Sequence, residues 1–136
     1  MVDVLTKEQR SRLMGRVSHF DTPPEIAVRR LLHSLGYRFR LHRKDLPGRP
    51  DIVLPRLKKV IFVHGCFWHR HTGCRKATTP KSNADYWQNK FAENVERDRR
   101  AIAELLRLGW EPMVVWECET RDIDALSQAL STFFRS

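Results

Sequence analysis

PDIVLPRLKKVIFVHGC, residues 50–66, decides the fold of this chain. Two short apolar runs, 50–54 and 59–63, flank a segment that opens with proline, as in two strands joined by a turn. We therefore predict a hairpin. Counting alternate positions across it places Asp51 and His64 on the same face and at the same end, so an acid and a histidine should meet there.

A strand, helix and strand unit follows the hairpin. Apolar spacing predicts a long helix over about 83–108, and 110–116 reads as another buried strand. A right-handed crossover makes this strand parallel to 59–63, with both carboxyl ends at one edge of the sheet. Residues 64–66 and Cys118 should therefore lie close together.

The residues before the hairpin predict one helix and one strand. Thr22 as N-cap, a proline at the first helical position and Glu25 three residues after the cap predict a helix over 23–35, and Gly36 ends it. Alternating apolar and basic residues over 37–41 predict a half-buried strand. The helix cap alone explains the presence of Glu25.

The remaining segments complete an αβββαβα order, which follows a basic helix near the N-terminus. A short, basic, weakly amphipathic helix is predicted over 6–18, a loop over 65–82 and a last helix from Ile123 to about Phe133. No repeat or linker interrupts the chain. We expect one domain, with a helical segment in 1–20 and a core over 22–136.

Composition restricts the classes of protein that fit. The 136 residues are 41% hydrophobic and 30% charged, without an apolar run long enough for a bilayer, so we expect a folded domain without a membrane partner. The net charge of +9 favours a polyanion such as nucleic acid. Without an apolar signal segment, we expect a cytoplasmic protein, and we expect it to be a monomer.

Three cysteines and nearby histidines predict a metal site. The spacing Cys66-x4-His71-x2-Cys74, with Cys118 brought near by the crossover, offers three thiolates and an imidazole, enough for tetrahedral zinc. Spacing leaves open whether His69 or His71 is the ligand. The alternative is a set of unrelated buried thiols beside surface histidines.

Two further features suggest chemistry on nucleic acid. Asp51 beside His64 and His69 combines a carboxylate for Mg²⁺ with groups that move protons, as phosphodiester hydrolysis requires, unless Asp51 merely begins a strand. Phe67 and Trp68 in a polar loop suit a wedge between base pairs. Alternatively, these aromatic residues cover the zinc site.

Four motifs carry a family resemblance: PGRPD (47–51), VIFVHGCFWH (60–69), NVERDRR (94–100) and VWEC (115–118). Over nearly its whole length the chain resembles the very short patch repair (Vsr) mismatch endonucleases. The resemblance implies a restriction-endonuclease-like αβββαβ core, with a mixed sheet flanked by helices, a zinc-stabilised loop and an N-terminal helix. It also implies Mg²⁺-dependent nicking of DNA 5′ to the thymine of a T·G mismatch, which initiates repair of deaminated 5-methylcytosine, with mismatch-repair proteins as partners.

The resemblance also implies roles for individual residues. Asp51, with the backbone carbonyl of Val63, would bind Mg²⁺, and His69 would act as the base, supported by His64 and Glu25. A set of four residues would bind zinc: Cys66, His71, Cys74 and Cys118. Another set would contact DNA. Phe67 and Trp68 would form a wedge that enters from the major groove, while Met14 and Val17 would lie on the N-terminal helix, with Met14 approaching from the minor groove. The residues at the mismatched pair would be Lys90, Asn94 and Asp98.

One departure from the broader restriction-like class concerns the third strand. That class carries Glu-x-Lys there, whereas this chain has Phe62 and His64 at the matching places, so a histidine must take over from the lysine. The alternative function is a non-catalytic, zinc-stabilised DNA-binding module.

Overall fold

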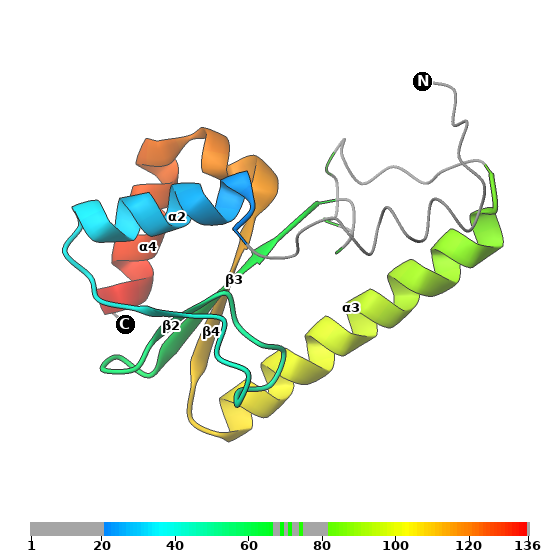
Figure 1. Cartoon of the computed structure of the whole chain (residues 1–136), viewed down its shortest axis with the longest axis horizontal. Helices are drawn as coiled ribbons and strands as arrows, with labels where there is room; N and C mark the ends of the chain where they lie inside the picture. Colours follow the sequence, from blue (N-terminus) through cyan, green and yellow to red (C-terminus); the bar gives the residue numbers. More distant parts are fainter. Residues whose placement is uncertain (1–20, 67–68, 70, 72–73, 75–81, 136) are drawn as a thin grey trace.

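The computed structural model describes residues 21–66, 69, 71, 74 and 82–135. The predicted order αβββαβα is confirmed, with a short 3-10 helix added before the last helix. The elements are α2 (Pro23–Ser34), β1 (Arg40–Leu41), β2 (Ile52–Leu54), β3 (Lys59–His64), α3 (Ala84–Arg107), β4 (Glu111–Trp116), η1 (Glu117–Arg121) and α4 (Ile123–Arg135) (Figure 1). The helix predicted over 6–18 lies outside the described residues.

The four strands form one mixed sheet in the order β1-β2-β3-β4. The pairs β1/β2 and β2/β3 are antiparallel and β3/β4 is parallel, as the hairpin and the crossover predicted. In the hairpin, Ile52 pairs with Ile61, so one further step places Asp51 opposite Phe62. In the parallel pair, the last partners are His64 and Trp116.

The first strand is shorter than the predicted range 37–41. The β1/β2 ladder holds only Arg40 and Leu41. Tyr37 and Phe39 instead pack against the buried cluster beneath α2, where Phe39 meets the His33 ring edge-on at 4.9 Å. Packing on the helix has therefore replaced strand pairing.

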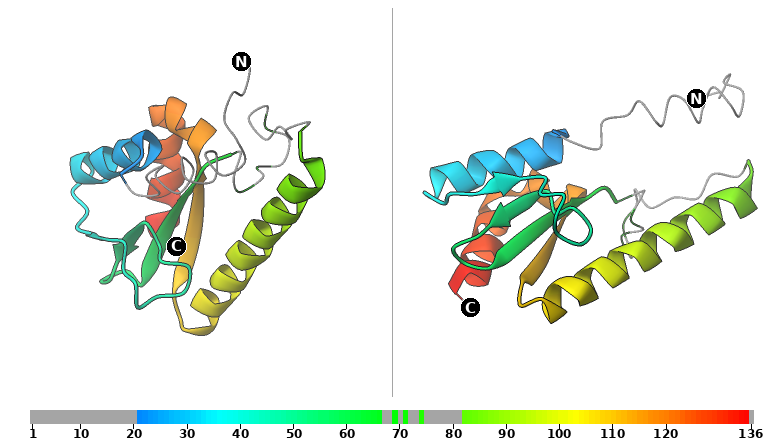
Figure 2. Two further views of the ribbon diagram at one scale, coloured as in Figure 1. Left: turned by 45° about the vertical axis from the view of Figure 1, so that its right-hand side comes forward. Right: turned by 60° about the horizontal axis from the view of Figure 1, so that its bottom comes forward.

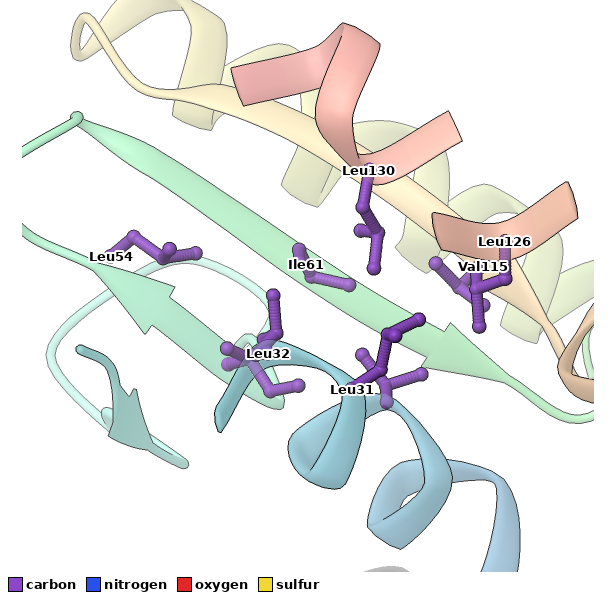
Figure 3. Close-up of a cluster of buried hydrophobic side chains, with 9 residues drawn as sticks. Leu31, Leu32, Leu54, Ile61, Val115, Leu126 and Leu130 are labelled. Carbon is purple, nitrogen blue, oxygen red and sulfur yellow. The ribbon is translucent and has the colours of Figure 1, made fainter. Parts of the chain in front are cut away.

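Helices cover both faces of the sheet, so the strands are buried on two sides (Figures 1 and 2). The cluster on the α2 and α4 face comprises Val28, Leu31, Leu32, Ile52, Leu54, Ile61, Val115, Leu126 and Leu130 (Figure 3). The cluster on the α3 face comprises Leu46, Val53, Val60, Phe62, Leu105 and Trp110. Among the helices of the described part, none is long and apolar enough to cross a bilayer.

Local signals fix where α2 begins and ends. Thr22 accepts the backbone N–H of Glu25 through its hydroxyl, 3.4 Å away. The Glu25 carboxylate does not complete the expected capping box on Thr22 but accepts the N–H of Asp21 at 3.0 Å. Gly36, at a φ of +84°, turns the chain out of the helix.

Gly48 positions the segment that leads into β2. Its φ of +74° suits glycine, and a Cβ there would lie 2.6 Å from the Ala101 side chain and 3.1 Å from that of Phe62. The close approach of this backbone to α3 and β3 sets the path of the chain just before Asp51.

Candidate active site and metal centre

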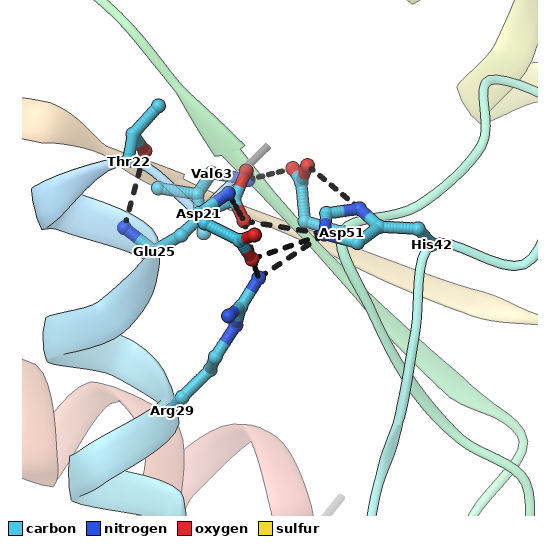
Figure 4. Close-up of polar contacts among 7 residues, drawn as sticks. All are labelled: Asp21, Thr22, Glu25, Arg29, His42, Asp51 and Val63. Carbon is cyan, nitrogen blue, oxygen red and sulfur yellow. Dashed lines mark hydrogen bonds and ion pairs between the residues drawn. The ribbon is translucent and has the colours of Figure 1, made fainter. Parts of the chain in front are cut away.

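Three carboxylates, an arginine and a histidine form a group that we call the carboxylate cluster: Asp21, Glu25, Arg29, His42 and Asp51 (Figure 4). Glu25 is 2% exposed, and one of its oxygens accepts from Arg29 at 2.7 Å. Asp51 accepts the backbone N–H of Val63 at 2.7 Å, and its other oxygen lies 3.9 Å from the His42 ring. Elements distant in sequence thus bring these carboxylates to one end of the sheet.

The cluster contains three carboxyl groups but a single arginine. Burial raises the pKa of Asp51 to about 8, and the neighbouring Glu25 adds to the rise, while the Val63 N–H and the Arg29 charge oppose it. Two adjacent carboxylates of this kind are oxygen ligands of the type that Mg²⁺ prefers. The donor set therefore fits a divalent cation.

A second group consists of two stacked histidines and an aspartate, and we call it the histidine pair. The rings of His64 and His69 stack at 3.8 Å between centroids, with an interplanar angle of 7°. Nδ1 of His69 lies 2.5 Å from the carboxylate of Asp98 on α3. Burial lowers the pKa of His64 to about 4, with a further lowering from His69, so His64 is neutral near pH 7.

The third group, the cysteine cluster, comprises Cys66, His71, Cys74 and Cys118. Their ligand atoms all lie within 4.8 Å of one another, and the three cysteines form no disulfide. Nδ1 of His71 is 3.6 Å from the sulfur of Cys66 and 3.4 Å from that of Cys118, and its ring stacks on Trp116 at 4.3 Å. His71, rather than His69, is the histidine that the structure places with the thiols.

Strand register explains how the cysteine cluster assembles. Cys66 and Cys118 each follow a paired strand end by two residues, because His64 pairs with Trp116. Burial raises the pKa of Cys66 to about 11, and the adjacent thiols add to the rise. Three sulfurs and one imidazole nitrogen match the donor set of structural zinc sites.

The three groups share the carboxyl end of β3. Val63 touches the carboxylate cluster, His64 belongs to the histidine pair and Cys66 begins the cysteine cluster. Carboxylates and histidines that could support hydrolysis therefore lie beside a set of thiols and an imidazole that could hold a metal, on one short stretch of chain.

Comparison with known proteins identifies the family. The family described as "DNA mismatch endonuclease Vsr" matches residues 2–76. The Type II nicking enzyme V.XorIIP of Xanthomonas oryzae pv. oryzae is 56% identical over 130 residues, which are 96% of this chain and 95% of that relative. The chain belongs to the Vsr family of DNA mismatch endonucleases.

Two other similarities agree with this assignment. The DNA mismatch endonuclease Vsr of Escherichia coli K12 is 42% identical over 132 residues, 97% of this chain and 84% of that protein. The catalytic domain of the homing endonuclease I-Bth0305I superposes with a TM-score of 0.59 at 22% identity, covering 84% of this chain and 95% of that domain. The latter shows the restriction-endonuclease-like fold that the family resemblance implied.

Some DNA-contacting residues predicted for this Vsr-family chain lie outside the described residues, namely Met14, Val17, Phe67 and Trp68. Lys90, Asn94 and Asp98 lie four residues apart on α3 and therefore share one face of the helix. Asp98 contacts His69, so this row of side chains begins at the histidine pair and continues toward the amino end of α3. Figures 1 and 2 show that end of the helix extending beyond the sheet.

Sequence reasoning missed three partners in the site. The hairpin suggested His64 as the histidine nearest Asp51, whereas the structure places His42 beside it, because the N–H of His42 binds the Asp51 carbonyl at 3.2 Å. Arg29 lies one helical turn after Glu25, a spacing that could have revealed it. The contact between Asp98 and His69 joins segments far apart in sequence and left no local signal.

Proposed function

We propose that this chain nicks the DNA strand 5′ to the thymine of a T·G mismatch, with Mg²⁺ as cofactor, and thereby initiates very short patch repair of deaminated 5-methylcytosine. Membership of the Vsr family and relatives named as nicking enzymes support the reaction class. The observation that carries the proposal is the position of the largely buried Asp51 and the buried Glu25 at the strand end that also carries the histidine pair. This arrangement favours an endonuclease over a non-catalytic DNA-binding module.

Asp51 is the proposed Mg²⁺ ligand, together with the backbone carbonyl of Val63. Its carboxyl group is largely buried beside Glu25, and a bound cation would replace the proton that its raised pKa retains near pH 7. When bound, Mg²⁺ would neutralise charge on the scissile phosphate and lower the pKa of water. The Val63 N–H fixes one oxygen of Asp51, which orients the carboxylate.

His69 is the proposed general base. Because Asp98 accepts the Nδ1 proton, Nε2 of His69 is the nitrogen that can take a proton from the attacking water. The Asp98 carboxylate also stabilises the imidazolium that forms. We therefore assign Asp98 a positioning role at His69, beside its predicted place at the mismatched pair.

His64 and Glu25 are the proposed supporting groups. A neutral His64 stacked on His69 adds no second positive charge, so a single charge forms on the pair during proton transfer. Glu25, held by Arg29 and the N–H of Asp21, adds the second carboxylate next to Asp51. Both residues thus shape the charge of the site around the reacting water.

The cysteine cluster is the proposed zinc site, with a structural role. A closed set of four ligands leaves no position for substrate, which is typical of structural zinc. Holding residues 66, 71, 74 and 118 together would tie the segment after β3 to the end of β4. Because His69 lies between Cys66 and His71 in the sequence, a zinc ion bound by these two residues would also hold His69 in place.

DNA with a T·G mismatch is the proposed substrate, and mismatch-repair proteins are the proposed partners in repair. Lys90 and Asn94 share the face of α3 that leads away from His69, where DNA entering the site would run. The proposed wedge of Phe67 and Trp68, with Met14 on the opposite groove, would open the base stack at the mismatch.

Nicking of end-labelled duplexes tests the proposal. Matched duplexes carrying T·G, T·A or another mismatch at one position, with randomised flanks, are incubated with Mg²⁺ or with EDTA, and the products are mapped on a denaturing gel. We expect one nick, 5′ to the thymine, in the T·G duplex with Mg²⁺ alone. Binding of the T·G duplex without any nick would favour the non-catalytic module.

A further inference from the structure

Arg29 lies at the centre of the carboxylate cluster. One guanidinium nitrogen, Nη2, is 2.7 Å from an oxygen of Asp21, 2.7 Å from an oxygen of Glu25 and 3.1 Å from Nε2 of His42 (Figure 4). A single side-chain nitrogen from α2 thus contacts two carboxylates at the start of that helix and a histidine that follows β1. Arg29 itself is largely buried, with 17% of its side chain exposed.

The same three partners have the composition of a metal site. One ligand atom each from Asp21, Glu25 and His42 lie within 4.8 Å of one another, as ligands of a divalent ion would. A guanidinium is always protonated in proteins, and its nitrogen already stands among these atoms at hydrogen-bond distance. An ion and this nitrogen cannot share the space, because they would overlap and repel.

The geometry also limits how far Arg29 can move away. Glu25 is 2% exposed and one helical turn from Arg29, so their pairing is set by α2 itself. Removing the guanidinium would leave a buried carboxylate without its main counter-charge, which is costly unless another cation takes its place.

We propose that Arg29 is a positioning residue that serves as the resident cation of the carboxylate cluster, holding Glu25 against Asp21 and filling the place that a second divalent ion would take. Any catalytic ion is then confined to the Asp51 side of the cluster. This last step rests on the proposed function, in which Asp51 binds Mg²⁺.

Counting bound ions tests the role of Arg29 without DNA or nicking. Mn²⁺ bound per folded full-length chain is measured by equilibrium dialysis for the parent, Arg29→Met and Arg29→Lys. We expect Arg29→Met to bind one more Mn²⁺ per chain than the parent, and Arg29→Lys to match the parent because its ammonium supplies the cation. Adding Asp21→Asn to Arg29→Met should remove the extra ion.

Arg30→Met is the matched control, because Arg30 is the exposed neighbour on the same helix and loses the same charge. Its ion count should equal that of the parent. An unchanged count in folded Arg29→Met would overturn the proposal. If Arg29→Met does not fold, the Asp21→Asn variant of the parent is measured instead. A lower Mn²⁺ count in that variant would show that an ion already occupies the cluster and would overturn the proposal. An unchanged count would support the proposal that Arg29 fills this place.

These results are separable from the proposed nicking activity. A parent that fails to nick T·G duplexes with Mg²⁺ would refute the proposed function, yet the difference in ion count between Arg29→Met and the parent would stand. Conversely, normal nicking with equal ion counts would refute only the role of Arg29.

Discussion

The carboxylate cluster and the cysteine cluster lie at the same end of β3 but are built in different ways. Hydrogen bonds from backbone and side chains hold the carboxylates, such as Val63 to Asp51 and Arg29 to Glu25. Nδ1 of His71 lies 3.6 Å from the sulfur of Cys66 and 3.4 Å from that of Cys118, separations that suit two ligands of one tetrahedral zinc ion. The contacts of the folded chain hold the carboxylate cluster together, whereas a bound metal ion would hold the cysteine cluster together.

Because of this difference, we expect loss of the metal from the carboxylate cluster to affect activity and loss of the metal from the cysteine cluster to affect stability. The carboxylate cluster gathers three carboxyl groups around one arginine at a site that the surrounding elements already shape, so an ion there would serve chemistry. The cysteine cluster gathers residues around a segment with few apolar side chains, so an ion there would serve folding. The following predictions test whether the two roles separate.

The largest effect on activity is expected from Asp51→Ala. Nicking of a T·G duplex should fall by at least about 10³-fold, because a metal ion supplies several kcal/mol of transition-state stabilisation. Single-turnover nicking measures the rate, and a gel-shift titration with Ca²⁺ measures binding, which should stay near that of the parent. A variant with near-normal turnover would remove Asp51 from the proposed metal site.

His69→Ala tests whether the histidine between the two clusters belongs to the chemistry. Its nicking rate should fall by about 10²–10⁴-fold, the usual contribution of a general base. Asp98→Asn should cause a smaller loss, because it disturbs the orientation of His69 and leaves the ring in place. Zinc content and melting temperature should match the parent in both variants, and a pH–rate profile unchanged by His69→Ala would argue against the base.

Cys118→Ser tests the structural side of the comparison. Structural zinc binds with on the order of 10 kcal/mol, so losing even a few kcal/mol of it should lower the melting temperature by about 10 °C or more. Elemental analysis should find one zinc in the parent and less than one in the variant. Parent protein purified without zinc, or a variant as stable as the parent, would contradict the structural role.

The smallest expected effect is a pH dependence of the carboxylate cluster. Because the pKa of Asp51 is raised to about 8, a proton competes with Mg²⁺ below that pH, and the half-saturating Mg²⁺ concentration should rise by about tenfold per unit. The folded metal-free protein also holds a proton that the unfolded chain releases, so its stability should fall as the pH rises from about 4 to 8.

Urea unfolding at several pH values checks the second statement. Asp51→Asn should flatten the fall in stability, and saturating Mg²⁺ should restore stability at pH 8. Equal slopes for the parent and Asp51→Asn would assign the pH dependence to other groups.

Sequence alone predicted the elements whose signals are local. The cap at Thr22, the stop at Gly36 and the two apolar runs on either side of the turn placed α2 and the hairpin to within a residue or two. The crossover rule then placed Cys118 near the end of β3, where the structure also has it. These features depend on backbone chemistry and chirality, which a sequence carries directly.

Contacts set by tertiary packing were beyond that reasoning. The two-residue strand β1 gives no readable register, so its pairing, which brings His42 to Asp51, could not be deduced. The contact between Asp98 and His69 depends on how far α3 tilts across the sheet. An aspartate on a helix surface is common and does not by itself indicate a partner. The sequence also gives no measure of the tilt of α3.

The most direct test of the central claim, that one metal acts in chemistry and the other in structure, is a chelation and readdition experiment on a single preparation. The protein is washed briefly with EDTA, its zinc is measured, and nicking of a T·G duplex is assayed without metal, with Mg²⁺ and with Zn²⁺. We predict that zinc stays bound, that nicking is lost, and that Mg²⁺ alone restores it. Nicking that persists without Mg²⁺, or that returns only with Zn²⁺, would contradict the account.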